Sequence, residues 1–156
     1  MKNVESGIHI IKILTGKGYC FMEDKYYSEL VLIRMERAAE LLKDATELLA
    51  NDSYKSANNR AYYAIEKAIN ALLIDKHIET KTHNGALKMF NVEYVRVENA
   101  YFTDEDYRLI AKAEQIRSVS DYDDFYVASK EETKKQVENA QYLIDKIKAY
   151  FHYEKN

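Results

Sequence analysis

The residues best suited to chemistry are arginines, tyrosines, an aspartate and a histidine that fall near the ends of expected helices. They are Arg60, Tyr63, His83, Arg117, Asp121 and Tyr122. Arginine offers a planar, permanently charged fork for a phosphate, and a neighbouring tyrosine can position the bound group or be modified itself. A purely structural reading is also open, in which Arg117 pairs with Asp121 and the tyrosine hydroxyls satisfy backbone groups.

Metal and phosphate-loop chemistry find little support in the sequence. The four histidines are far apart and form no His-x-x-x-His or Glu-x-x-His pair, so we expect neither a metal site nor a cofactor. The single cysteine, Cys20, excludes an internal disulfide and a cysteine metal cluster. Gly16-Lys17-Gly18 lacks the spacing of a phosphate loop, and we interpret it as a turn.

Charge and hydropathy narrow the choice of partners. The net charge of −3 gives no global basic field, so any contact with RNA would come from a local patch. No stretch is apolar for the length that a membrane span requires. We therefore expect a protein that does not enter the membrane, and a cytoplasmic location.

The elements that must position these residues are predicted to be helices. The chain of 156 residues contains no proline and only four glycines, which favours helices over a sandwich or barrel. Apolar residues at helical spacing predict a first long helix over about 24–50 and a second over about 54–76. Because the turn between them at 51–53 is short, the two helices should be antiparallel neighbours.

The second of these helices should lie at the centre of the assembly. One face carries only alanines, at steps of four and three: Ala57, Ala61, Ala64, Ala68 and Ala71. A bulky stripe runs beside it: Tyr62, Ile65, Ile69 and Leu72. A helix with apolar residues on both faces is buried on both. Arg60 and Tyr63 share this central helix, where an arginine needs a partner or a ligand.

Capping patterns place the remaining helices. Thr82 can cap a short helix, Thr103 with Asp106 resembles a capping box for a helix ending near Val119, and Ser129 with Glu132 opens the last helix. The stretch 91–100 could be strand or loop. The fold class is therefore all-α, an antiparallel up-and-down bundle of four long helices plus one short helix. We divide the chain into an appendage, 1–21, which could be a short hairpin or a flexible arm, and a helical bundle, 22–156.

Four motifs in order resemble the HEPN superfamily, in particular its small prokaryotic members. They are A-N-N-R-A-Y-Y-A at 57–64, A-L-L at 71–73, K-T-H at 81–83 and R-x3-D-Y-x2-F at 117–125. The resemblance covers about 26–151. It implies a HEPN-like helical bundle that forms a homodimer. It also implies a place in toxin–antitoxin or RNA-processing systems, with a partner such as a minimal nucleotidyltransferase.

Active HEPN ribonucleases carry Arg-x4–6-His and cut RNA without metal, the arginine holding the scissile phosphate and the histidine acting on the ribose hydroxyl or leaving oxygen. Arg117 matches the arginine, but 122–124 read Tyr-Asp-Asp, and Lys67 stands where Arg60 would need its histidine. The acidic loop would also repel an RNA backbone. These departures favour a degenerate, non-cleaving module.

Two alternatives remain. An active ribonuclease toxin would use Arg117 with His83 or Tyr122 as a substitute for the missing histidine, and a purely structural helical adaptor would use neither. Whether or not the protein cleaves RNA, we expect a bound RNA or nucleotide to contact Arg60, Tyr63, Arg117, Asp121 and Tyr122. The resemblance also implies that a partner transferase could adenylylate a tyrosine near the arginine, for which we nominate Tyr122, with Tyr126 behind it.

Overall fold

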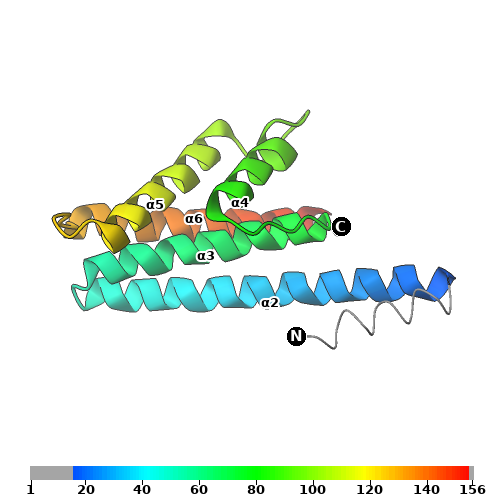
Figure 1. Cartoon of the computed structure of the whole chain (residues 1–156), viewed down its shortest axis with the longest axis horizontal. Coiled ribbons are helices and arrows are strands. Elements are labelled where there is room, and N and C mark those ends of the chain that lie inside the picture. Colours follow the sequence, from blue (N-terminus) through cyan, green and yellow to red (C-terminus); the bar gives the residue numbers. More distant parts are fainter. Residues whose placement is uncertain (1–15, 155–156) are drawn as a thin grey trace.

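The computed structural model describes residues 16–154, and the side chains within 23–152. Helices account for nearly all of this part of the chain, which contains no strand (Figure 1). The elements are α2 (Gly16–Ala50), α3 (Tyr54–Asp75), α4 (His83–Phe90), a π-helical turn η1 (Asn91–Val95), α5 (Asp104–Tyr122) and α6 (Lys130–Glu154). The prediction of an all-α fold with four long helices and one short helix is confirmed. Within the same residues no helix is both long and apolar enough to cross a membrane.

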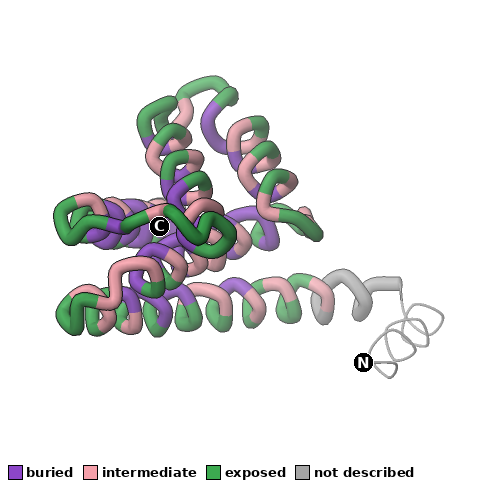
Figure 2. The backbone as a smooth tube through the Cα atoms, turned by 60° about the vertical axis from the view of Figure 1, so that its left-hand side comes forward, coloured by how far each residue is buried: buried purple, intermediate pink, exposed green. Residues whose placement is uncertain are grey.

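The central helix of the assembly is α3. It packs against α2, α4, α5 and α6. Helices α2, α3 and α6 lie side by side, with α2 and α3 antiparallel, while α4 and α5 lean away from this layer at an angle (Figure 1). Burial follows this arrangement, because the buried residues of each helix gather on the side that faces its neighbours (Figure 2).

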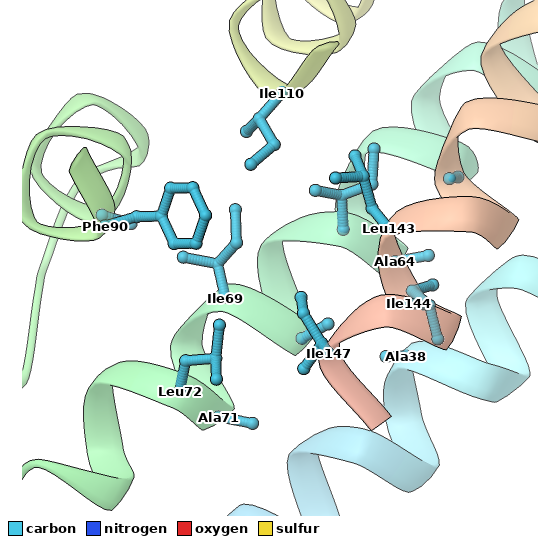
Figure 3. Packing of buried hydrophobic residues seen from close by; sticks show 14 of the residues in the cluster. Ala38, Ala64, Ile69, Ala71, Leu72, Phe90, Ile110, Leu143, Ile144 and Ile147 are labelled. Carbon is cyan, nitrogen blue, oxygen red and sulfur yellow. The ribbon is translucent and has the colours of Figure 1, made fainter. Parts of the chain in front are cut away.

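Packing around α3 explains why this helix carries two apolar faces. Every alanine of the predicted ladder is at most 1% exposed, as expected for a face that lets neighbouring helices approach closely. On the bulky side, Ile69 points toward Phe90 of α4 and Ile110 of α5 (Figure 3). Elsewhere in the same core, Ala64 lies near Ile144 of α6 (Figure 3). The prediction that the second helix is buried on both faces is confirmed.

The caps largely follow the predicted pattern. Thr82 Oγ1 accepts a hydrogen bond from Gly85 N at 2.9 Å and so fixes the start of α4. The Thr103–Asp106 capping box is complete at the start of α5. Ser129 Oγ accepts from Glu132 N at 3.1 Å, but the Glu132 carboxylate accepts from Tyr126 Oη at 2.5 Å, so only the serine half of that box is present.

Three local predictions were wrong. Helix α2 begins at Gly16, so 16–18 is helical and neither the glycine turn nor a strand over 19–22 forms. Glycine costs a helix about 1 kcal/mol per residue, which a helix as long as α2 can bear near its end. Within 91–100, the strand is absent and 91–95 form η1, with Asn91 at helical angles (φ −59°, ψ −50°); only 96–100 are loop. The end of α5 lies at Tyr122 rather than near Val119. The rest of the proposed hairpin, at 1–15, lies outside the described residues.

Candidate functional site

Arg117 is a buried cation held by carboxylates of its own helix. Its side chain on α5 is only 5% exposed. Nη2 donates to Glu114 Oε1 at 2.8 Å, and Nη1 donates to Asp121 Oδ2 at 3.4 Å. Burial lowers the pKa of Arg117, but the hydrogen bonds that it donates to these two carboxylates outweigh burial and raise it. The guanidinium is therefore protonated, and its positive charge is balanced by the carboxylates of Glu114 and Asp121.

Tyr62 of α3 forms the surface on which this guanidinium rests. Arg117 Cζ lies 5.4 Å from the Tyr62 ring centroid and 5.9 Å from that of Tyr122, both within the range of a cation–π contact. Burial raises the pKa of the Tyr62 hydroxyl, and the negative charges of Glu66 and Glu114 raise it further. Tyr62 is therefore a neutral phenol at physiological pH.

His83 approaches the same tyrosine from α4. Its ring centroid lies 5.5 Å from that of Tyr62 in an edge-to-face arrangement and 5.8 Å from that of Tyr63. His83 Nδ1 is hydrogen-bonded to Glu66 Oε1, which leaves the imidazole oriented by a carboxylate. The position of His83 follows from the Thr82 cap, because His83 is the first residue of α4.

The result is one cluster built from three helices. We call it the arginine–histidine cluster, and it comprises Tyr62, Tyr63, Glu66, His83, Glu114, Arg117 and Asp121. Asn59 Nδ2 ties α3 to α5 at its edge by donating to both oxygens of Asp121, at 3.0 and 3.1 Å. Asp121 therefore accepts hydrogen bonds both from Arg117 on its own helix and from Asn59 on the central helix α3.

The structure brings most of the predicted site residues together. Tyr63, His83, Arg117 and Asp121 are members of the cluster, and Tyr122 touches its arginine while remaining 79% exposed. Arg60 is not brought to the cluster. It lines a separate surface hollow with Asp44, Glu47, Leu48 and Asn51, toward α2. The reason is helical geometry, since residues two positions apart on a helix point in nearly opposite directions, and Tyr62 is the one that faces α5.

Sequence reasoning missed three members of the cluster: Tyr62, Glu66 and Glu114. We assigned Tyr62 to the packing stripe, but its ring both packs in the core and faces the Arg117 guanidinium. Glu114 could have been found from its spacing, because it precedes Arg117 by three residues on one helix. Nothing local pairs Glu66 with His83, since they lie on different helices.

The chemistry available to the cluster is limited by its charge. Glu66, Glu114 and Asp121 surround the two basic groups, and both terminal nitrogens of Arg117 already donate to a carboxylate, while its Nε is buried without a partner. A phosphate would therefore have to compete with two carboxylates for the guanidinium. Among the side chains that the structure describes, those of 23–152, no three His, Cys, Asp or Glu residues gather in a geometry that could hold a metal ion. The ring centroid of Tyr122 lies 5.9 Å from Arg117 Cζ and the residue is 79% exposed, so its phenol is an accessible nucleophile near the arginine.

Comparisons with known proteins agree with the sequence motifs. A family model described as "HEPN domain" matches residues 31–150. A Methanocaldococcus jannaschii protein named "Putative toxin MJ0142" is 31% identical over 129 residues, covering 83% of this chain and 86% of the relative. A second protein of that organism, named "Putative toxin MJ0605", is 36% identical over 73% of this chain and 83% of its own length. A Thermotoga maritima protein named "UPF0332 protein" is 32% identical over 71% of this chain and 83% of the relative.

Proposed function

Because this chain belongs to the HEPN family, we propose that it is a non-cleaving HEPN protein of a toxin–antitoxin-like system, acting as a homodimer. The observation that carries the proposal is the state of Arg117. A ribonuclease of this family needs its arginine for the scissile phosphate, yet here the guanidinium is 5% exposed and bonded to Glu114 and Asp121. Displacing two carboxylates to admit a third anion would cost much of what the phosphate contact gains. The sequence at 122–124 also supplies no histidine.

We further propose that a partner, a minimal nucleotidyltransferase, acts on Tyr122. Tyr122 is the last residue of α5 and is 79% exposed, so an enzyme can reach its side chain. In the reaction the Tyr122 oxygen attacks the α-phosphorus of ATP, pyrophosphate leaves, and the phenol proton passes to a base of the transferase. Mass spectrometry after co-expression with the transferase should show added AMP on the peptide that carries Tyr122. An unmodified peptide would remove this part of the proposal.

One observation favours a second candidate, a metal-independent endoribonuclease. Arg117 and His83 lie against the same Tyr62 ring, so a histidine from α4 is available to replace the one missing from the motif. In that mechanism His83 would take the ribose 2′-hydroxyl proton and Arg117 would bind the phosphate. It requires Arg117 to exchange Glu114 or Asp121 for RNA.

Growth of a bacterial host during induced expression separates the two candidates. A non-cleaving module should leave growth at the rate of the empty vector, for both the wild-type chain and the Arg117→Ala variant. Growth arrest by the wild type that Arg117→Ala and His83→Ala each relieve would overturn the first candidate in favour of the second. Light scattering gives the oligomeric state separately, with a dimer expected at twice 18.3 kDa.

A further inference from the structure

A second polar hollow lies beside the cluster, between α3 and the segment that leads into α4. Its volume is about 410 Å³, within the range of small-ligand sites. Lys67 and Asn70 contribute from α3, and Thr80, Lys81 and Thr82 contribute from the segment before α4. Glu66 and His83, shared with the arginine–histidine cluster, complete the wall. We call this feature the lysine hollow.

The lysine hollow carries positive charge that its wall does not balance. Lys67 and Lys81 form no ion pair with any residue in the described part of the chain, in contrast to Lys76 and Lys146, which pair with Glu93 and Asp106. The single carboxylate in the wall, Glu66, is already bonded to His83. The wall therefore has a net positive charge whether His83 is protonated or neutral. In a protein of net charge −3, two unpaired lysines facing one concave space favour an anion there.

Neutral groups around the lysines suit the same kind of ligand. Thr80 Oγ1 donates to Asn70 Oδ1 at 3.3 Å, which holds the two polar side chains of the wall together. Behind them, Arg34 Nη1 donates to the Asn70 carbonyl at 3.0 Å and adds a third cation close to the hollow.

We propose that the lysine hollow binds a phosphate group, with Lys67 and Lys81 as its cationic ligands. The phosphate belongs to an RNA backbone or to a nucleotide. This choice of sources rests on the proposed function, but the binding itself requires neither cleavage nor modification of Tyr122. The acidic arginine–histidine cluster and the basic lysine hollow meet at Glu66 and His83. A nucleic acid would therefore be held beside Arg117 rather than by it.

Binding of two probes to the full chain tests the proposal. One arm titrates a fluorescent ten-nucleotide RNA by anisotropy at low ionic strength, and the other titrates ATP by calorimetry. Lys67→Gln and Lys81→Gln should each weaken binding about tenfold, the gain typical of one charged contact to a phosphate. The matched control is Lys88→Gln, an exposed lysine of α4 outside the hollow, which should stay within about twofold of the wild type.

Salt dependence adds a readout that loss of folding would not mimic. If both lysines contact RNA phosphates, the Lys67→Gln/Lys81→Gln double variant should flatten the plot of log binding constant against log salt by about 1.4, or about 0.7 per contact. An effect in the RNA arm alone identifies a backbone phosphate, and one in the ATP arm alone identifies a nucleotide; either supports the site. Absence of wild-type binding in both arms, or equal weakening by Lys88→Gln, would overturn it. The melting temperature of each variant shows whether it is folded. The growth test described above tests the proposed function independently of phosphate binding.

Discussion

Replacing Arg117 with methionine should destabilise the protein by a large and calculable amount. Methionine keeps an apolar stem against Tyr62 but removes the guanidinium. The 2.8 Å bond to Glu114 joins two charged groups, and bonds of this kind are worth about 1.5–3 kcal/mol. The 3.4 Å bond to Asp121 adds less. Because Glu114 and Asp121 are 25% and 27% exposed, both can rehydrate once unpaired, which limits the loss. We expect about 2–3 kcal/mol in total.

A thermal melt followed by circular dichroism measures this loss. For a chain of this size about 1 kcal/mol lowers the melting temperature by 2–4 °C, so Arg117→Met should melt about 4–12 °C below the wild type. The same helix offers a matched control in Arg108, which pairs with Glu105 at the same three-residue spacing but is 74% exposed. Arg108→Met should give no resolvable shift, because exposed pairs contribute little. Equal shifts for the two variants would refute the conclusion that Arg117 is a buried cation stabilised by its bonds to Glu114 and Asp121.

Three further predictions concern packing, acid stability and a helix cap. Ala64→Leu should cost about 1–3 kcal/mol by denaturant unfolding, because the alanine face of α3 is completely buried; unchanged stability would show that the face can expand. Burial alone would raise the pKa of Asp106, but hydrogen bonds led by the one from Lys146 hold it below 3.8. Its contribution to stability is complete above pH 3.8 and is lost as pH falls through the folded pKa, so Asp106→Asn should show a smaller acid loss in melts between about pH 5 and pH 2. Gly85→Ala should destabilise α4 despite the higher helix propensity of alanine, since its Cβ would lie 2.8 Å from Thr82 Oγ1; a higher melting temperature would contradict this.

Most of the fold could be predicted because its signals are local. The alanine ladder of α3 and the Thr103–Asp106 box each specify a face or an end by spacing within one helix, and the structure confirms both. The wrong predictions concern residues whose type favours a turn or a strand but which the structure includes in a continuous helix. Gly16 and Gly18 read as a turn, yet α2 runs through them, and Asn91 continues the backbone geometry of α4 instead of opening a strand.

The candidate site was predictable only in part, because it is assembled from three helices. Spacing along α5 was enough to pair Arg117 with Asp121. Spacing could not show that Tyr62, rather than Arg60, turns toward Arg117, since both lie on the most buried helix of the chain. Nor could it bring Glu66 to His83, a contact set by the crossing of α3 and α4.

The central claim, that Arg117 is bound by its own helix's carboxylates and does not serve RNA cleavage, is tested most directly by a cleavage assay. Labelled RNA would be incubated with excess purified wild-type protein in the presence of a metal chelator and resolved on a denaturing gel. If Arg117 is held by Glu114 and Asp121 as proposed, the RNA stays intact over the full time course. Fragments produced by the wild type but not by Arg117→Ala would contradict it.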